Sequence, residues 1–178
     1  RALGARSIIA DPRNPQTQDR VNLVIKQREK FRPFAPVVIN EYKHDYFDCD
    51  FDSPYMTEVC PVKKNAYLPA ITHIDGTARI QTVSINDRNH PFVELLKEFY
   101  NLTNCPVLLN TSFNLRGEPI VNTVEEALST FIHSEMDALV LENYLIYRED
   151  LPFNLSDIKK PLLSERDDEA RTTVYTFF

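Results

Sequence analysis

The stretch NCPVLLNTSFNLRGEPIV, residues 104–121, decides the fold of this chain. It begins as a buried strand should, with the continuous apolar run 107–109 after a proline. It then changes into small hydrogen-bonding side chains at 110–114, before the turn residues Arg116 and Gly117. Ligands of open α/β sheets bind outside the carboxyl ends of strands. The stretch therefore predicts a core strand that ends in a polar binding region.

Three polar side chains carry this prediction. Asn110, Ser112 and Asn114 alternate onto one side of the predicted strand because side chains repeat every two residues. Their amide and hydroxyl groups can hold phosphate oxygens or a small carbonyl compound without burying an unpaired charge. The same residues can also form a turn that satisfies its own backbone. The residues alone leave both interpretations open.

The rest of the chain predicts an α/β domain with a mixed, twisted sheet, because strands alternate with helices. A helix is expected from the N-cap Asp19 to about Phe31, with Val21 and Ile25 on its buried stripe and Lys26 flanking it. Further helices are expected at 91–103 and after a capping box at 123–126. Strands are expected at 34–40, in a hairpin around Asp75-Gly76, and in a pair at 137–149. Residues 41–66 are expected to have little regular structure.

The organisation of the chain is predicted to be one domain, residues 1–150, with a loosely attached charged tail at 151–178. The 178-residue chain is 43% hydrophobic, which is typical of a globular protein. It has no initiator Met and reads as a piece of a longer protein. Three cysteines without CxxC spacing favour a reduced, cytoplasmic setting, and no apolar run is long enough to span a membrane.

The charge is distributed unevenly along the chain. Residues 1–35 hold eight Lys/Arg and three acidic residues, a balance of +5, whereas the remainder holds 12 basic and 23 acidic residues, a balance of −11. One basic segment in an acidic chain indicates a local anion site rather than a broad nucleic-acid surface.

Four cations are candidates for that anion site. Lys26, Arg28 and Arg32 precede the strand at 34–40, and Arg forks bind phosphate in a bidentate manner. A solvated helix face is the simpler alternative, but two phenylalanines and two prolines frame Arg32. Arg79 is predicted to lie within a strand and to share a face with Gln81, so it needs an acidic partner or a bound anion.

Other chemistry is less well supported by the residues. Cys105 is best explained as a small core residue, because no His is adjacent in sequence to activate a nucleophile. His73 has no second ligand at i+2 or i+4, so no metal site is predicted. No glycine-rich phosphate loop is present.

Five motifs together resemble the C-terminal part of the NodU/CmcH-type O-carbamoyltransferases. They span about residues 1–147 in the family's order: RALGARSIIADPR, VIKQREKFRPFAPVV, SPYM, LPAITHIDGTARIQTV and CPVLLNTSFNLRGEPIV. The resemblance implies a YrdC-like fold, an open twisted mixed β-sheet flanked by helices. It also implies a partner domain of the actin-like ATPase fold, N-terminal in the same chain, which carries a metal and transfers the carbamoyl group.

The resemblance implies a specific reaction. The YrdC-like domain takes ATP, with Mg²⁺ bound mainly through the nucleotide, and carbamoyl phosphate, and forms carbamoyl-adenylate. No tightly bound cofactor is expected in this domain. The other domain then places the carbamoyl group on an acceptor hydroxyl. Because the family's longer element is cut before Arg1, the chain alone is not expected to carry out O-carbamoyl transfer.

The resemblance also assigns roles to residues. Lys26, Arg32, Arg79 and Ser112 would be catalytic, with the cations stabilising phosphate charge. The residues that would bind substrate or nucleotide are Arg1, Arg28, Asn110 and Asn114. Two competing interpretations are a non-catalytic module that binds nucleotide or phosphate or docks a partner domain, and an RNA-binding YrdC-like domain. The net charge of −6 argues against nucleic acid.

Overall fold

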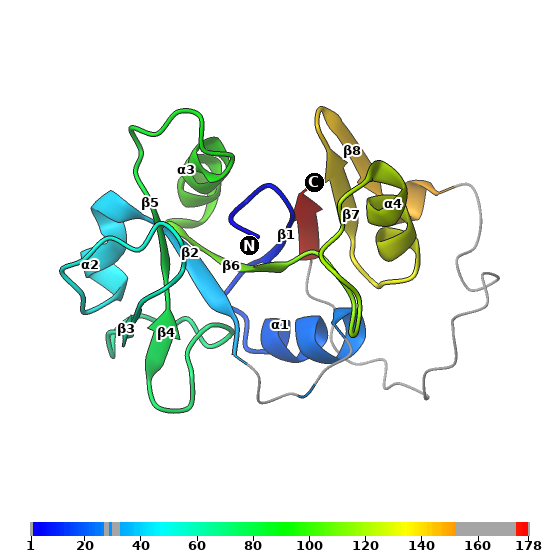
Figure 1. Cartoon of the computed structure of the whole chain (residues 1–178). Helices are drawn as coiled ribbons and strands as arrows, with labels where there is room; N and C mark the ends of the chain where they lie inside the picture. The colour runs from blue at the N-terminus through cyan, green and yellow to red at the C-terminus, as the bar shows by residue number, and fades with distance from the viewer. Residues whose placement is uncertain (1, 27–28, 30–32, 152–173, 178) are drawn as a thin grey trace.

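The computed structural model describes residues 2–26, 29, 33–151 and 174–177 (Figure 1). A seven-stranded sheet forms the centre of this part of the chain, in the order β5-β2-β6-β1-β9-β7-β8. Its strands are β1 (Ser7–Ala10), β2 (Ala35–Ile39), β5 (Gln81–Val83), β6 (Val107–Ser112), β7 (Ala138–Leu141), β8 (Tyr144–Tyr147) and β9 (Val174–Phe177). A smaller sheet pairs β3 (Val59–Pro61) with β4 (Thr77–Arg79).

The large sheet is mixed, as predicted. β2 pairs with β5 and β7 with β9 in parallel, whereas β6 runs antiparallel to both of its neighbours, β1 and β2. The register places Ala35 of β2 and Ile9 of β1 on either side of Asn110. The α/β class is therefore confirmed, while the more specific YrdC-like assignment stays a prediction.

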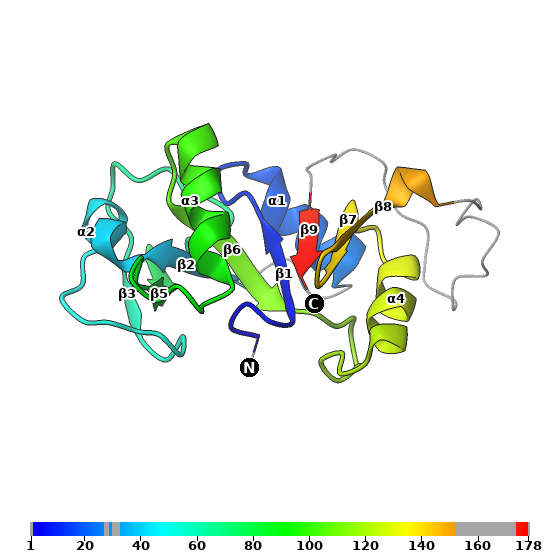
Figure 2. The same ribbon diagram turned by 90° about the horizontal axis from the view of Figure 1, so that it is seen from above.

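Helices cover both faces of the sheet. α3 (Phe92–Thr103) packs on β2 and β6, and α1 (Gln16–Asp19), continued by the π-helical turn η1 (Arg20–Ile25), lies on the opposite side (Figures 1 and 2). α4 (Val124–Ile132) packs on β7. The shorter elements are η2 (Asn40–Tyr42), α2 (Lys43–Tyr46) and η3 (Arg148–Asp150). Within the described ranges, none of the helices is long and apolar enough to cross a membrane.

Two apolar clusters fix these layers. The α3 side buries Ile9, Val37, Leu108 and Leu96, with Phe92 at the start of the helix. The other side is larger and combines η1, α4, β3 and β4 with the alternate residues of β1, β2 and β6. This division follows from the two-residue period of the strands, which sends Leu108 and Leu109 of β6 into different clusters.

Several local predictions are confirmed. Pro91 precedes α3, and the predicted strand pair near the end of the chain is β7 and β8. Thr123 caps α4 by accepting from Glu126 N at 3.2 Å. The Glu126 carboxylate accepts from Asn122 N at 2.6 Å, one residue before the position that the capping box predicts.

Two local predictions were wrong. The first helix begins at Gln16 rather than after an Asp19 cap, although Val21 and Ile25 are buried as predicted. The Asp75-Gly76 turn exists, with His73 N donating to Thr77 O at 2.8 Å, but β4 after it pairs with β3 instead of with the residues before the turn. Residues 41–66 consequently supply a strand and core side chains.

The end of the chain differs from the predicted tail. Val174–Phe177 form β9, which lies between β1 and β7 and joins the two halves of the sheet. The expectation of a loosely attached segment is therefore wrong for these four residues. Residues 152–173 lie outside the described part of the chain, and the boundary at residue 150 stays a prediction.

Candidate functional site

The end of β6 is built around the ammonium group of Lys26. Lys26 Nζ donates to Ser112 O at 2.6 Å and to Asn114 Oδ1 at 2.6 Å, and it also contacts Ser112 Oγ at 3.1 Å and Asn114 O at 2.9 Å. The residue is only 5% exposed, so it does not flank the buried stripe as the helical pattern predicted. The difference arises because η1 ends at Ile25, which turns the next side chain toward the strand end. The fold thus brings Lys26 together with Ser112 and Asn114.

The polar strand end is also a self-bonded turn. Ser112 Oγ donates to Asn114 Oδ1 at 2.7 Å, and Asn114 Nδ2 donates to Glu118 O at 2.7 Å. The Glu118 carboxylate accepts from Leu115 N at 3.1 Å. The turn therefore satisfies many of its own polar groups while it holds a fixed positive charge. The self-bonded turn is thus present, while the binding of phosphate or a carbonyl compound at this strand end stays a prediction.

Asn110 belongs to a different hydrogen-bonded group. Its Nδ2 donates to Gln81 Oε1 at 2.7 Å and to Ala2 O at 3.1 Å, and Gln81 Nε2 contacts Leu3 O at 3.4 Å. Both amide side chains are buried. Asn110 Oδ1 is buried without a hydrogen-bond partner among the described residues. The pair holds the start of the chain against the sheet, a role that the sequence did not reveal for Gln81.

The conformation of residues 2–6 requires a glycine at position 4. Gly4 has φ +118°, and a Cβ at this position would lie 2.8 Å from Pro91 Cγ. Its N–H donates to Ser7 Oγ at 3.1 Å, and Arg6 Nη1 donates to Val121 O at 3.2 Å. Residues 2–6 therefore approach the sheet closely on the α3 side, where only glycine fits the turn.

Arg79 lies elsewhere in the fold. It ends β4 in the small sheet and is exposed, and its Nη2 approaches Met56 Sδ at 3.9 Å. Gln81 begins β5 in the large sheet and is buried. The prediction that the two side chains share a face was wrong, because the chain passes from one sheet to the other at Ile80 and the strand period is interrupted there.

His73, Asp75 and Thr77 form a polar group near Arg79. Thr77 Oγ1 donates to Asp75 Oδ1 at 2.7 Å and contacts His73 Nδ1 at 3.2 Å. Burial lowers the pKa of His73, the Arg79 charge lowers it further, and Asp75 acts in the opposite direction. Among the described contacts, no hydrogen bond joins this group to Lys26 or Ser112. Of the predicted catalytic residues that the structure describes, Lys26 and Ser112 thus lie in one region and Arg79 in another.

The SPYM segment links Arg79 to β5 of the large sheet. Ser53 N donates to Thr82 Oγ1 at 2.8 Å, and Thr82 N donates to Ser53 O at 3.0 Å. Lys43 Nζ holds the preceding residues through Asp52 Oδ1 at 2.6 Å. Met56, with φ 58°, then lies against Arg79. The buried Ser53 holds the SPYM segment against β5. The sequence alone assigned no role to Ser53, although the residue lies in this motif.

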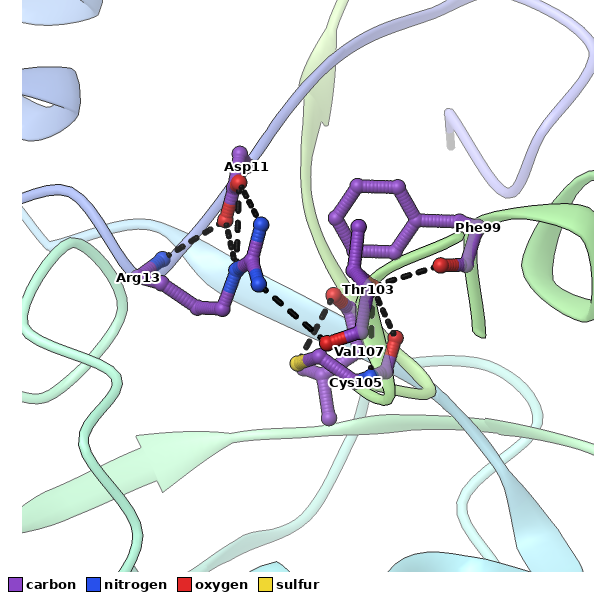
Figure 3. A network of polar contacts seen from close by, with 6 residues as sticks. All are labelled: Asp11, Arg13, Phe99, Thr103, Cys105 and Val107. Carbon is purple, nitrogen blue, oxygen red and sulfur yellow. Dashed lines mark hydrogen bonds and ion pairs between the residues drawn. The ribbon is translucent and has the colours of Figure 1, made fainter. Parts of the chain in front are cut away.

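Cys105 is a structural residue in this fold, as the sequence indicated (Figure 3). Its thiol is 4% exposed and donates to Val107 O at 3.7 Å, and burial raises its pKa. Nearby, Arg13 forms an ion pair with Asp11 at 2.6 Å and donates to Thr103 O at 3.3 Å. This network ties the loop after β1 to the end of α3.

Three predicted site residues, Arg1, Arg28 and Arg32, lie outside the described part of the chain. The register of β2 shows that the chain enters the sheet at Ala35, directly beside Asn110 of the strand end. In the described ranges, no group of three or more His, Cys, Asp or Glu residues could hold a metal ion.

Comparison with known proteins gives a consistent result. Residues 1–148 match the family described as Carbamoyltransferase C-terminus. The chain is 48% identical over 151 residues to nodulation protein NolNO of Sinorhizobium fredii, which covers 82% of the chain and 22% of that protein. It is 42% identical over 127 residues to the 3'-hydroxymethylcephem-O-carbamoyltransferase of Amycolatopsis lactamdurans, which covers 71% of the chain and 24% of that protein.

A protein of Synechocystis sp. whose name states no activity is 47% identical over 181 residues, which covers 89% of this chain and 29% of the relative. The chain spans less than a third of the length of each of these relatives. The matched residues include all five motifs and both regions of the candidate site. The chain therefore belongs to the carbamoyltransferase C-terminus family, as the C-terminal domain of a NodU/CmcH-type protein.

Proposed function

We propose that this chain binds ATP and carbamoyl phosphate and forms carbamoyl-adenylate, for transfer to an acceptor hydroxyl by an N-terminal domain. The observation that carries the proposal is the contact of Lys26 with Ser112 and Asn114, 86 and 88 residues away. The family resemblance assigns these residues to one phosphate pocket from two separate motifs. Their contact in the fold supports that assignment.

The proposed reaction consumes water. Carbamoyl phosphate is hydrolysed to carbamate and phosphate. A carbamate oxygen then attacks the α-phosphorus of ATP, the bond from this phosphorus to the bridging oxygen breaks, and pyrophosphate leaves. Both substrates are polyanions, so fixed cations are needed to offset their repulsion and the charge of the transition state. Mg²⁺ would enter with the nucleotide phosphates.

The two regions suit different parts of this task. Lys26 is held by four oxygen atoms and supplies a cation with a fixed place at the strand end. Ser112 Oγ and Asn114 carry the hydrogen-bonding groups beside it. Arg79 is exposed and free to form a bidentate contact with a phosphate. We assign Lys26 to orientation at the strand end and Arg79 to charge stabilisation during adenylyl transfer.

Pyrophosphate release tests this function. The chain, and the full-length protein, would be given ATP, Mg²⁺ and carbamoyl phosphate, with each omitted in turn. We expect release that requires all three. No release from either protein would contradict the proposal, and release from the full-length protein alone would assign completion of the pocket to the other domain.

A binding module without turnover is the second candidate. It is favoured by one observation, the internal hydrogen bonds of Ser112 and Asn114, which occupy groups that a substrate would need. Such a module would show thermal stabilisation by ATP or carbamoyl phosphate and no pyrophosphate in either protein. The same assay therefore separates the two candidates.

A further inference from the structure

Two of the three cysteines lie opposite each other on adjacent extended segments. Phe47 and Val62 form an antiparallel bridge. Lys63 N donates to Tyr46 O at 2.8 Å on one side of this bridge, and Asp48 N donates to Pro61 O at 2.9 Å on the other. Continuing this register by two residues places Cys49 opposite Cys60.

The hydrogen bonds also identify the type of pair. The two hydrogen bonds flank Phe47 and Val62, so these residues form a non-hydrogen-bonded pair. In an antiparallel ladder, pairs of this type recur every two residues. Cys49 and Cys60 thus occupy the next non-hydrogen-bonded position, where Cα atoms are typically about 4.5 Å apart. A disulfide accepts Cα separations of about 4.4–6.8 Å. A register that continues from Phe47 and Val62 therefore gives the two cysteines the spacing that a disulfide needs.

The burial pattern places both thiols on one side. Phe47, Cys49 and Cys60 are buried, whereas Asp48 and Pro61 between them are exposed. Burial raises the pKa of Cys60 to about 12, and the charge and hydrogen bond of the neighbouring Cys49 raise it as well. The two side chains consequently point toward each other into the same apolar cluster. Both are free thiols in this structure.

We propose that Cys49 and Cys60 are an oxidative modification site, which forms an intrachain disulfide when a peroxide or a disulfide oxidant reaches it. With hydrogen peroxide, two thiols lose two hydrogens and two electrons to form one S–S bond, and the peroxide is reduced to two water molecules. With oxidised glutathione, the same thiols are oxidised and two glutathione thiols are released. Cys105 lies in a different network, at the end of α3, and takes no part.

The disulfide would close the segment 49–60, which contains the SPYM motif. Ser53 in this segment is hydrogen bonded to Thr82 of β5, and Met56 lies against Arg79. Cross-linking restricts the unfolded chain and thereby stabilises the fold. Oxidation thus fixes the support of Arg79 covalently, at a place distinct from Lys26.

Peptide mass mapping tests the site directly. The folded chain would be treated with oxidised glutathione, unfolded, alkylated with iodoacetamide and cleaved with trypsin. Cleavage after Lys43 and Lys63 leaves both cysteines in peptide 44–63, whereas Cys105 falls in peptide 98–116. We expect peptide 44–63 to be two hydrogens lighter and unalkylated, with peptide 98–116 alkylated. Alkylation of all three cysteines, or a link that includes Cys105, would overturn the proposal.

Thermal unfolding provides the matched comparison. Oxidation should raise the Tm of the wild-type chain by about 5 °C, and dithiothreitol should reverse the rise. Cys105→Ser should show the same rise, whereas Cys49→Ser should show none. If Cys49→Ser does not fold, the mass shift of the wild-type peptide still decides the site. A rise in Tm of the Cys49→Ser variant equal to that of the wild type would contradict the assignment.

Discussion

Lys26 and Arg79 belong to motifs of the same family, but Lys26 is buried and Arg79 is exposed. Lys26 is buried at the end of η1, where four oxygen atoms of Ser112 and Asn114 surround its ammonium group. Arg79 is exposed on the small sheet, and its Nη2 approaches the sulfur of Met56 at 3.9 Å.

The difference separates two functions of a cation. A buried ammonium group contributes to the fold, because its removal leaves oxygen acceptors without a donor. An exposed guanidinium contributes little to the fold and remains available to an anion in solution. Substitutions at Lys26 should therefore change stability and turnover together, whereas substitutions at Arg79 should change turnover alone.

The largest effect on stability is expected for Lys26→Met. The free energy of unfolding should fall by about 3 kcal/mol, because the variant removes a buried donor that holds partly buried oxygens of Ser112 and Asn114. Urea denaturation measures this change. Lys97→Met is the matched control, since Lys97 forms a surface pair with Glu94. Equal stability of the two variants would show that the strand end does not depend on Lys26.

Arg79→Ala should lower the rate of pyrophosphate release about 100-fold, the usual cost of removing one group that stabilises transition-state charge. Its free energy of unfolding should stay within about 0.5 kcal/mol of the wild-type value, because the side chain is exposed. Arg88→Ala, another exposed cation in the loop before α3, is the control for general charge effects. A normal rate in the Arg79 variant would remove Arg79 from the site.

A smaller effect is expected for Gln81→Met, which has similar volume but lacks the amide. Its removal takes away the acceptor of Asn110 Nδ2 and the contact with Leu3 O, at a cost of about 1 kcal/mol. Trypsin should also cut faster after Arg6, because the start of the chain is held less firmly. Unchanged stability and cleavage would mean that the hydrogen bonds of Asn110 and Gln81 to Ala2 and Leu3 do not hold the start of the chain in place.

The smallest effect concerns the titration of His73. Arg79→Ala should raise the pKa of His73, because it removes a positive charge that lowers this pKa, although burial remains the larger cause. Proton NMR of the imidazole measures the shift. Since the folded pKa lies below the ordinary value of 6.5, the unfolded chain binds the proton more readily, and His73 reduces stability as the pH falls through 6.5. If the pKa of His73 is the same in the wild type and in Arg79→Ala, the charge of Arg79 does not act on His73.

Strands β2, β6, β7 and β8 and the two longer helices could be predicted because each has a local cause, whereas β1 and β3 lie in segments that were expected to be irregular. β6 follows from its apolar run, α3 from its amphipathic stripe and α4 from the Thr123 cap. The position of β9 could not be predicted, because it depends on pairing with β1 and β7 far away in the sequence. The same limit explains the pairing of β4 with β3 instead of across the Asp75-Gly76 turn.

The candidate site was predicted in composition but not in arrangement. The polar end of β6 and the basic segment were recognisable, and Lys26 does contact Ser112 and Asn114. The burial of Lys26 depends on the end of η1, and the separation of Arg79 from Gln81 depends on the change of sheet at Ile80. Both are tertiary effects that strand and helix periods do not encode.

The exchange of radiolabelled pyrophosphate into ATP tests the proposed reaction most directly, because exchange requires adenylate formation to run in both directions. It would be measured in the full-length protein and in this chain, with and without carbamoyl phosphate. We predict exchange in the full-length protein that depends on carbamoyl phosphate and is lost in Arg79→Ala. Exchange that is absent, or that proceeds equally well without carbamoyl phosphate, would contradict the formation of carbamoyl-adenylate.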